Sequence, residues 1–330
     1  MRSGLLALLL CAVASLAAAE PVGAAKKITI GVLKFGTVSW VLDTIQANEL
    51  DKAEGIELDI VPLASTQATT VGLQGASVDI VATDWLWVSR ERSSGGDFTF
   101  SPFTTALGSI MLPPNSPIKT LADLKGKKIG VAGGPLDKSW LLIVAYALRT
   151  ANLDLRTDTR QEFGAPPLLN ERAKQGAIDA VLNFWPYAAR LEAEGFTQLI
   201  RLEDVVRELG AKGEVAMVGY VFSEAWAKKN LDGIQGFLRA ATKADDLLAT
   251  SDQEWERLKK LMGENDPSFN DATFEALRRH YREGIPERSA AENESDAKVL
   301  YQFLRELGGE KLVGAGTELA PGTFWQGGKS

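Results

Sequence analysis

Residues 78–85 read V-D-I-V-A-T-D-W, and residues 178–185 read I-D-A-V-L-N-F-W. Both stretches begin with an aliphatic residue and an aspartate, run through valine and end on tryptophan, and a short glycine-containing segment precedes each. The aliphatic part of each stretch is typical of a buried strand. The recurrence predicts that the chain builds the same strand unit twice, once in each of two similar lobes.

The sequence before the first stretch alternates strand and helix patterns. Strands are predicted over 28–32, 56–61 and 79–82, with helices over 38–50 and 67–74 between them. Strands that alternate with helices pair in parallel through right-handed crossovers. The first lobe is therefore predicted to open with the order β-α-β-α-β, and residues 78–85 contain its third strand.

The same order returns around the second stretch. Strands are predicted over 128–132, 157–163 and 178–182, with helices over 139–152 and 167–176. The apolar residues of the first of these helices, such as Trp140, Leu141 and Val144, recur at helical spacing. Residues 178–185 thus contain the third strand of a second lobe.

Two further segments are predicted to join the lobes as crossing strands. Residues 98–112 have no helical period, and residues 216–222 form a strand pattern that leaves the second lobe. The helical patterns that follow are predicted to complete the first lobe, and the glycine-rich end of the chain is predicted to be loose. The predicted division is lobe 1 in 27–112, lobe 2 in 113–215, lobe 1 again in 216–313 and a loose tail in 314–330.

Composition limits the classes of protein that fit. The 330 residues are 45% hydrophobic and 24% charged, which is globular composition with room for two lobes. The formal net charge of −7 disfavours a nucleic-acid partner, because such proteins are usually basic.

The first residues predict an exported protein. Arg2 precedes an unbroken run of apolar or small residues over 5–19 that ends on Ala17-Ala18-Ala19, which predicts a signal peptide over 1–19, with cleavage after Ala24 as the alternative. Cys11, the only cysteine, lies inside this segment. Its removal would exclude disulfides, thiol catalysis and thiolate metal sites. A soluble periplasmic protein is expected.

The candidate site follows from the strand ends, since ligands of open parallel sheets bind beyond the carboxyl ends of the strands. The polar and aromatic side chains at these positions are Lys34, Thr37, Trp40, Ser65, Thr66, Asp84 and Trp85 in lobe 1 and Lys138, Ser139, Trp140, Asn183, Trp185 and Tyr187 in lobe 2. Lysines and helix N-termini bind anions, and aromatic faces bind a flat or apolar body.

Several of these residues also have a structural explanation. Ser65 or Thr66 is expected to cap the next helix, and Asp84 can cap the helix that it precedes. Core packing is the structural alternative for Trp40. Trp85 and Trp185 are expected to face each other across a cleft between the lobes, because each ends the third strand of its lobe.

Five segments resemble a known family. They are I-G-V at 30–32, K-A-E-G-I-E-L-D-I-V-P at 52–62, Q-G-A-S-V-D-I-V at 74–81, S-P-I-K-T-L-A-D-L-K-G-K-K-I-G-V at 116–131 and Q-G-A-I-D-A-V at 175–181. Together they resemble the periplasmic substrate-binding proteins of ABC importers for nitrate, sulfonates, taurine and thiamine precursors, the NitT/TauT family. The resemblance covers roughly residues 27–250.

The resemblance implies an α/β, two-lobed type II periplasmic-binding fold. Each lobe would be a parallel-rich sheet flanked by helices, two crossing strands would join the lobes, and hinge closure would trap a small ligand between them. The expected partner is an ABC permease in the inner membrane, and a monomer is expected. No cofactor and no resident metal are expected.

Two departures bear on the ligand. The chain has Asn48-Glu49-Leu50-Asp51 where the family often has a Gly-Leu-Phe turn, and it places five tryptophans, at 40, 85, 87, 140 and 185, near the strand ends. So many indoles exceed what a small oxyanion needs, and they favour a larger, flat, anionic ligand. The candidates are pyrroloquinoline quinone, an aromatic carboxylate or sulfonate, and an organic metal chelate.

Two other functions remain as alternatives. Thiamine-pyrimidine synthases resemble this family but depend on a histidine and a cysteine-rich segment, whereas His280 is the only histidine here and stands in the charged run R-R-H-Y-R. An enzyme is therefore not expected. A protein that presents bound ligand to a sensor would share the same cleft and differ only in its partner.

Overall fold

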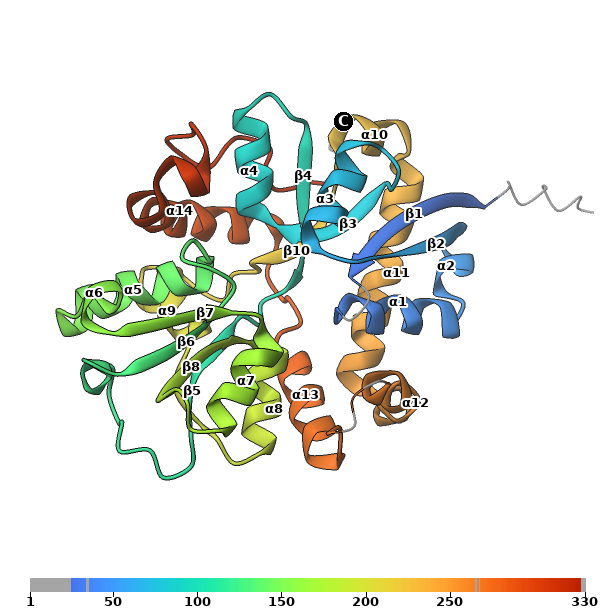
Figure 1. Cartoon of the computed structure of the whole chain (residues 1–330). Helices are drawn as coiled ribbons and strands as arrows, with labels where there is room; N and C mark the ends of the chain where they lie inside the picture. The colour runs from blue at the N-terminus through green and yellow to red at the C-terminus, as the bar shows by residue number, and fades with distance from the viewer. Residues whose placement is uncertain (1–24, 34–35, 265, 267, 328–330) are drawn as a thin grey trace, which may run out of the picture.

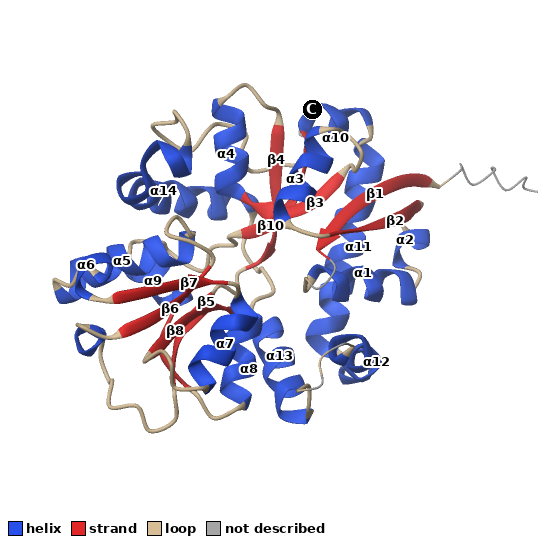
Figure 2. Cartoon of the chain, in the orientation of Figure 1, coloured by secondary structure: helices blue, strands red, loops and turns tan. Residues whose placement is uncertain are grey.

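The computed structural model describes residues 25–33, 36–264, 266 and 268–327. The predicted signal peptide over 1–19 and the candidate residue Lys34 lie outside the described residues. The described strands form two five-stranded sheets, each flanked by helices (Figures 1 and 2). One sheet has the strand order β2-β1-β3-β10-β4 and the other the order β7-β6-β8-β5-β9. We refer to the bodies built on them as lobe 1 and lobe 2.

The sheet of lobe 1 consists of β1 (Lys26–Leu33), β2 (Ile56–Leu63), β3 (Ile80–Asp84), β4 (Phe98–Thr104) and β10 (Val218–Ser223). Its helices are α1 (Val38–Ala47), α2 (Leu50–Ala53), α3 (Thr66–Gln74), α4 (Trp85–Ser93), α10 (Glu224–Lys229), α11 (Leu231–Thr250) and α12 (Asp252–Gly263). The predicted single helix over 38–50 is two helices. Glu49 adopts a left-handed backbone (φ 52°) between them, which ends α1 and starts a new turn.

The sheet of lobe 2 consists of β5 (Gly108–Leu112), β6 (Lys128–Ala132), β7 (Arg160–Gly164), β8 (Ala180–Phe184) and β9 (Thr197–Arg201). A 3₁₀ turn (Leu121–Leu124) and the helices α5 (Lys138–Ala151), α6 (Leu155–Asp158), α7 (Pro166–Lys174), α8 (Trp185–Ala193) and α9 (Leu202–Glu208) accompany it. Two later helices, α13 (Asp271–Glu283) and α14 (Ala290–Val313), lie between the lobes.

The two sheets repeat one pattern, which confirms the predicted duplication. β1 pairs in parallel with β2 and β3, as β6 does with β7 and β8. Next to each third strand lies an antiparallel strand that follows a crossing of the chain between lobes, β10 beside β3 and β5 beside β8.

Asp79 and Asp179, the aspartates of the repeated stretches, make matching hydrogen bonds in the two lobes. The Asp79 carboxylate accepts a hydrogen bond from the Thr29 amide at 2.8 Å, and the Asp179 carboxylate accepts one from the Lys128 amide at 2.8 Å. In return, the Asp79 amide donates to the Thr29 carbonyl, and the Asp179 amide donates to the Lys128 carbonyl, each at 2.8 Å. Each aspartate therefore fixes the start of the third strand against the first strand of its lobe.

Two glycines explain how closely these elements pack. A Cβ on Gly31 of β1 would lie 3.2 Å from the Val78 side chain, and one on Gly130 of β6 would lie 2.6 Å from the Ile178 side chain. Val78 and Ile178 are the first residues of the two repeated stretches. The aliphatic residue thus packs onto a glycine of the neighbouring strand in each lobe.

Apolar side chains fill both faces of each sheet, as expected for strands buried on two sides. Ile30 of β1 is buried with Val41 of α1 and Phe237 of α11 on one face of lobe 1. Val81 of β3 is buried with Leu73 of α3 on the other face. In lobe 2, α5 and α9 contribute to one core cluster, and α7 and α8 to another.

The boundaries between lobes differ from the prediction in two places. The strand β5 pairs with β8 and β9, so it belongs to lobe 2 although it was assigned to lobe 1; the crossing is shorter, at residues 105–107. The helices α13 and α14 were assigned to lobe 1, but α13 packs on α8 and α14 packs on α5, both in lobe 2. Helical periodicity gives the apolar stripe of a helix but does not say which lobe covers it.

The prediction of a loose tail is wrong for the described residues after 313. Phe324 bridges Phe100 of β4 in parallel, with the Phe100 amide donating to the Thr323 carbonyl and the Trp325 amide donating to the Phe100 carbonyl, each at 2.8 Å. Phe324 is 1% exposed. The apolar side chains of this segment bind it to lobe 1 despite its glycines.

Among the described residues, the helices are all too short or too polar to cross a lipid bilayer.

Candidate functional site

An ion pair joins the two lobes at their strand ends. Asp84 is the last residue of β3 in lobe 1, and Lys138 is the first residue of α5 in lobe 2. The Lys138 ammonium lies 3.1 Å from Asp84 Oδ2, and the two side chains are 25% and 18% exposed. The carboxyl ends of the two sheets therefore meet, as the sequence predicted from the order of strands and helices (Figure 1).

Both members of this pair stand at a helix N-terminus that the chain itself caps. Asp84 Oδ1 accepts a hydrogen bond from the Trp87 amide at 2.8 Å, which confirms the expected cap of α4. Asp137 Oδ1 accepts from the Ser139 amide at 2.9 Å and from the Trp140 amide at 3.3 Å, and so caps α5. These carboxylates occupy the positions where an anionic ligand would bind a helix N-terminus.

The charges of this group depend on one another. Burial raises the pKa of the Asp137 carboxyl, although the Lys138 charge and the two amides oppose the shift. Burial disfavours the charged form of Lys138, but the carboxylates of Asp84 and Asp137 outweigh it, and the pKa of Lys138 is raised. Lys138 therefore carries a positive charge between two carboxylates.

The helix starts that follow β7 and β8 in lobe 2 offer few amide donors. Pro166 and Pro167 open α7, and Pro186 stands in the first turn of α8, and proline has no N–H. Asn183, 1% exposed, is used within the protein: its amide donates to Asn170 Oδ1 at 2.8 Å and to the Pro166 carbonyl at 3.0 Å. Asn183 thus positions the starts of α7 and α8.

The helix starts of lobe 1 are more open. Thr37 precedes α1 without a side-chain cap, and its side chain is half-buried. Ser65 is exposed and caps α3, accepting from the Ala68 amide at 3.1 Å, which confirms the expected cap. Thr66 is exposed as the first residue of α3. These hydroxyls and the amides around them are the groups of lobe 1 suited to an anion.

Ser139 and Tyr187 are the remaining polar candidates of lobe 2. Both are half-buried, Ser139 beside Lys138 in the first turn of α5 and Tyr187 in the first turn of α8. Their positions after β6 and β8 place them at the strand ends, as the sequence predicted.

The tryptophans are placed differently from the prediction. Trp85 is 0% exposed and lies 6.5 Å from Phe324 between ring centroids, and Trp140 is 1% exposed. Trp185 belongs to a different core cluster from Trp85, so the expected pairing of Trp85 with Trp185 is wrong. A large apolar side chain in the first turn after a buried strand can turn back into the core, and these indoles do so.

Trp185 instead meets Trp40. Their ring centroids are 6.0 Å apart with an interplanar angle of 80°, and the two residues are 7% and 8% exposed. Tyr281 of α13 lies 5.9 Å from Trp40 and 6.3 Å from Trp185, and Trp255 of α12 lies 6.0 Å from Trp40. We call Trp40, Trp185, Tyr281 and Trp255 the aromatic cluster; it joins α1 of lobe 1 to α8 of lobe 2.

Sequence reasoning missed the exposed apolar residues of the strand ends. Leu33 ends β1 and is 37% exposed, Leu136 follows β6 and is 38% exposed, Phe163 in β7 is 37% exposed, and Leu168 in the first turn of α7 is 56% exposed. We call these four residues the apolar rim. The signal in the sequence was an apolar side chain in the last residues of a strand or in the loop and helix turn that follow it.

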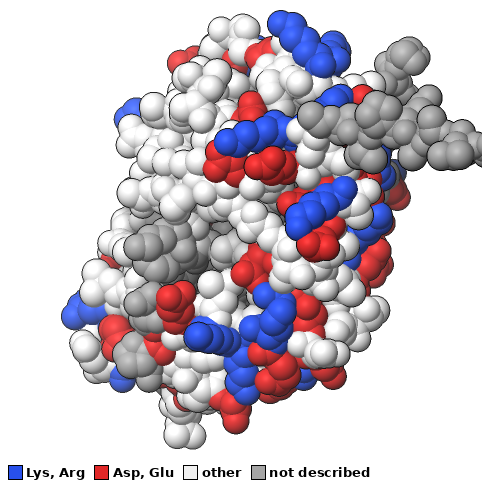
Figure 3. Space-filling model, turned by 90° about the vertical axis from the view of Figure 1, so that its right-hand side faces the viewer, with Lys and Arg blue, Asp and Glu red and all other residues white. Residues whose placement is uncertain are grey.

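Figure 3 shows one face of the molecule with a hollow at mid-height. Above this hollow the surface is mostly uncharged, whereas Lys, Arg, Asp and Glu gather beside and below it.

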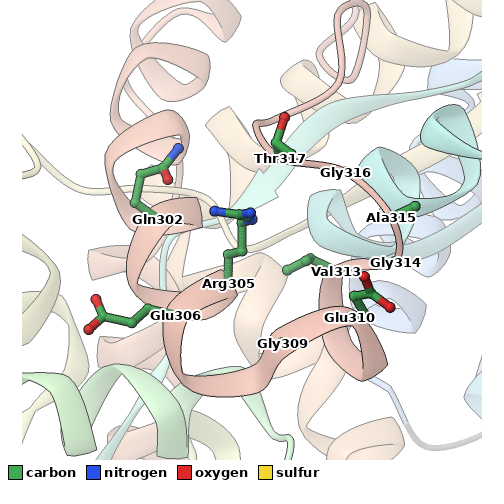
Figure 4. A pocket seen from close by; sticks show the side chains of 10 residues that line it. All are labelled: Gln302, Arg305, Glu306, Gly309, Glu310, Val313, Gly314, Ala315, Gly316 and Thr317. Atoms are coloured by element: carbon green, nitrogen blue, oxygen red, sulfur yellow. The ribbon is translucent and has the colours of Figure 1, made fainter.

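A cavity of about 530 Å³ lies elsewhere, between the end of α14 and the tail. Figure 4 shows Arg305 extending between Gln302 and Val313, while Glu306 and Glu310 lie at the margin. A second cavity of about 410 Å³ adjoins it through Ala315–Thr317. Neither cavity is lined by a candidate residue of the strand ends, and the strand ends take precedence because they carry the converging polar groups.

Within the described residues, no group of three or more His, Asp, Glu or Cys side chains is placed to hold a metal ion. His280, the only histidine of the chain, lies in α13 against Glu192 of α8 rather than among the strand ends.

The fold and the paired strand ends define a two-lobed periplasmic-binding type of protein, and comparison with solved structures supports this. The model aligns with the periplasmic aliphatic sulphonate binding protein SsuA from Escherichia coli at a TM-score of 0.72 and 23% identity, over 92% of this chain and 94% of that one. It aligns with the alkanesulfonate-binding protein SsuA from Xanthomonas axonopodis pv. citri, bound to MOPS, at a TM-score of 0.65 and 19% identity, over 93% and 99%. The predicted type II fold is confirmed.

The family is shown by sequence. The family model described as NMT1/THI5 like matches residues 47–254, and the chain belongs to this family. The resemblance to NitT/TauT binding proteins is thereby confirmed.

Two curated relatives come from Escherichia coli strain K12. One, a putative aliphatic sulfonates-binding protein, is 28% identical over 195 residues, 58% of this chain and 58% of that protein. The other, the L-cystine-binding protein TcyJ, is 29% identical over 138 residues, 41% of this chain and 47% of that protein. The matches span about half the length of these relatives.

Proposed function

We propose that this protein is the solute-binding component of an ABC importer, which captures a small anionic organic solute between two lobes in the periplasm. The observation that carries the proposal is the Asp84–Lys138 ion pair at 3.1 Å, because it brings the strand ends of both lobes to one place. The predicted division into two lobes, the monomeric state and the delivery of the solute to an inner-membrane permease belong to the same proposal.

The charges favour an anion that is held mainly by lobe 1. The hydroxyls of Thr37, Ser65 and Thr66 surround the starts of α1 and α3, where the helix dipole favours negative charge. Lys138 pairs with Asp84, so a ligand anion would compete with Asp84 for the Lys138 ammonium. Lobe 2 would then close onto an anion already bound.

The apolar surroundings favour a hydrocarbon body on that anion. Leu33 ends β1 in lobe 1, Leu136, Phe163 and Leu168 lie at or near strand ends of lobe 2, and all four are more than a third exposed. Burying this area on closure would contribute about 25 cal/mol per Å². The buried tryptophans no longer argue for a flat ring, so an aliphatic sulfonate or carboxylate is favoured over pyrroloquinoline quinone, an aromatic acid or an organic metal chelate.

The names of the relatives agree with an aliphatic sulfonate or carboxylate as the ligand. The Escherichia coli relative named for aliphatic sulfonates agrees with an organosulfonate, and the relative named for L-cystine agrees with a sulfur-containing solute that carries carboxylates. Closure would follow from the difference in contacts, because only the closed form lets the ligand touch both lobes.

The desulfurization enzyme DSZB shares the fold at a TM-score of 0.58 and 16% identity, over 86% of this chain. The described strand ends offer an ion pair and hydroxyls but no histidine or cysteine, which disfavours catalysis here. A protein that presents its ligand to a sensor would use the same site, and the discriminating observation is which membrane partner the loaded protein binds.

The test is a titration of purified protein by calorimetry. The panel contains linear alkanesulfonates of increasing chain length, the matching carboxylates, L-cystine, pyrroloquinoline quinone and nitrate. Saturable binding that strengthens with chain length is expected, and Lys138→Met should weaken it at least tenfold, whereas Lys228→Met on the far helix α10 should not change it. The absence of binding to every sulfonate and carboxylate, or equal binding by the Lys138→Met protein, would refute the proposal.

A further inference from the structure

Prolines distinguish the strand ends of lobe 2 from those of lobe 1. Pro135 stands between β6 and α5, Pro166 and Pro167 open α7, and Pro186 stands in the first turn of α8. The connections that follow β1, β2 and β3 in lobe 1 contain no proline. Because proline has no N–H, lobe 2 offers fewer backbone donors to an anion than lobe 1 does.

Three members of the apolar rim, Leu136, Phe163 and Leu168, belong to segments of lobe 2 that contact one another. The Gly133 amide donates to the Gly164 carbonyl at 3.1 Å, which joins the connection after β6 to the end of β7. A Cβ on Gly164 would lie 3.8 Å from Leu168 Cδ2, so the start of α7 packs against the same residue. The three segments are therefore joined where their apolar side chains are more than a third exposed.

This apolar surface adjoins the cation of lobe 2. Leu136 precedes Lys138 by two residues, and Trp140 follows it by two. The ring of Phe163 meets the buried ring of Trp140 edge to face, with the centroids 6.3 Å apart and an interplanar angle of 82°. Phe163 thus lies against the helix that Lys138 begins, so a ligand with its anionic end at Lys138 has apolar side chains beside it.

The carboxylates near this surface already have partners within the protein. Asp137 caps α5, and Asp84 of lobe 1 forms the ion pair between the lobes. Glu162 of β7 pairs with Lys128 and with Arg172, each at 2.7 Å. A cationic group on a ligand would therefore have to displace one of these partners.

The amide side chains near this surface are also used within the protein. Asn183 donates to Asn170 Oδ1 at 2.8 Å, Asn170 donates to the Tyr187 carbonyl at 3.0 Å, and the Phe184 amide donates to Asn183 Oδ1 at 2.9 Å. These bonds hold the starts of α7 and α8 together. The candidate groups of lobe 2 that remain are the hydroxyls of Ser139 and Tyr187, which carry no charge and belong to half-buried residues.

We propose that lobe 2 is an apolar lid in which Leu136, Phe163 and Leu168 select the ligand by its far end. A solute with one anionic head and a hydrocarbon tail is accepted, and a solute with a second charged group is rejected. This inference rests on the proposed capture of an anionic organic solute and narrows it. A linear alkanesulfonate or monocarboxylate fits the lid, whereas L-cystine, which has charged groups at both ends, does not.

The discrimination follows from the loss of water when the lid covers the ligand. Each methylene that moves from water onto apolar surface should strengthen binding about fourfold. A charged group that moves to the same place loses its hydration and gains no partner, which weakens binding. Selectivity of this kind comes from an unfavourable contact with the wrong ligand as much as from a favourable contact with the right one.

The test is calorimetry with matched pairs of ligands, hexanesulfonate with its ω-amino derivative and heptanoate with heptanedioate. The unchanged protein should bind the single-headed member of each pair at least tenfold more tightly. Leu168→Asp should reduce the preference for hexanesulfonate at least tenfold, because the new carboxylate gives the ammonium a partner, and an acidic residue is compatible with the first turn of α7. Leu148→Asp, at a 36% exposed position ten residues after Lys138 in α5, adds the same charge away from the strand ends and should keep the preference.

Phe163 provides a second set of variants. Phe163→Ser should reduce the same preference at least threefold, and Phe163→Leu, which restores an apolar side chain, should recover most of it. Circular dichroism verifies that each variant is folded, and the variants of either position are sufficient if those of the other do not fold.

Equal binding of both members of each pair by the unchanged protein would overturn the apolar lid. A preference that survives both Leu168→Asp and Phe163→Ser would overturn it too. In either case the sulfonate has bound, so the proposed capture of an anionic solute would stand. Binding of no sulfonate and no carboxylate would refute the proposed function and the lid together.

Discussion

Trp40 and Trp185 lie edge to face with their ring centroids 6.0 Å apart, although one belongs to α1 of lobe 1 and the other to α8 of lobe 2. Both indoles are more than nine-tenths buried. The pair is thus a packing contact between lobes and not an open pair of binding surfaces. Any opening of the lobes at this side must separate these rings or carry them together.

A double-mutant cycle should detect a coupling free energy between Trp40 and Trp185. Trp40→Ala and Trp185→Ala should each lower the free energy of unfolding by about 3 kcal/mol, because each empties a buried site. Their coupling should be about 1 kcal/mol, as for other edge-to-face pairs. Urea unfolding of both single variants and the double variant measures it. Trp85→Ala with Trp185→Ala is the matched control, and additive losses are expected there because the two indoles lie in separate clusters.

The sequence was sufficient for the duplicated fold because its signals are local. The stretches at 78–85 and 178–185 each predict a strand that begins with an aliphatic residue and an aspartate. In both lobes the aspartate binds the backbone of the first strand, and the aliphatic residue packs on a glycine of that strand. The caps by Ser65 and Asp84 are local too, and both are confirmed. The partner of Trp185 depends on how two distant helices pack, and no local pattern contains that information. The same reason explains the errors for α13, α14 and the tail.

The two repeated aspartates should contribute unequally to stability. Asp79→Ala removes the acceptor of the half-buried Thr29 amide and should lower the free energy of unfolding by about 1 kcal/mol. Asp179→Ala should cost less, because Asp179 and its contact with Lys128 are exposed and water can replace the carboxylate. Chemical denaturation of the two variants gives the comparison. A larger loss for Asp179→Ala would contradict this account of the repeat.

Two substitutions of Asp84 should separate its cap from its ion pair. Asparagine can still accept from the Trp87 amide, so Asp84→Asn should retain the cap of α4 and lose only the charge that faces Lys138. Asp84→Ala should lose both and be less stable than Asp84→Asn by about 1 kcal/mol. Thermal unfolding ranks the variants. With Lys138 released from its carboxylate, the Asp84→Asn protein should also bind the anions of the calorimetric panel more tightly than the unchanged protein.

Binding that is equal or weaker in Asp84→Asn would mean that Asp84 itself contacts the ligand rather than competing with it. Lys138→Met provides the matched case, since it removes the cation and leaves the cap of α4 in place. The two variants should therefore change affinity in opposite directions.

Asp245 should make stability depend on pH near neutrality. Burial is the main cause that raises the pKa of this carboxyl to about 7, against the opposing hydrogen bond from Tyr281. Because the folded-state pKa lies above the ordinary value of 3.8, the folded protein holds this proton more tightly than the unfolded chain does. Its contribution to stability is therefore complete at low pH and is lost as pH rises from about 4 to about 7. The slope is at most about 1.4 kcal/mol per pH unit.

Asp245→Asn should remove this slope, because the amide still accepts from the Tyr281 hydroxyl but does not titrate. Urea unfolding of both proteins at half-unit steps between pH 4.5 and pH 8 measures the difference, and the contributions of all other titratable groups cancel because both proteins retain them. The difference between the two free energies should change most between pH 5 and pH 7 and become constant above it. A constant difference over the whole range would mean that Asp245 is ionised in the folded protein throughout, with its charge stabilised by solvent rather than suppressed by burial.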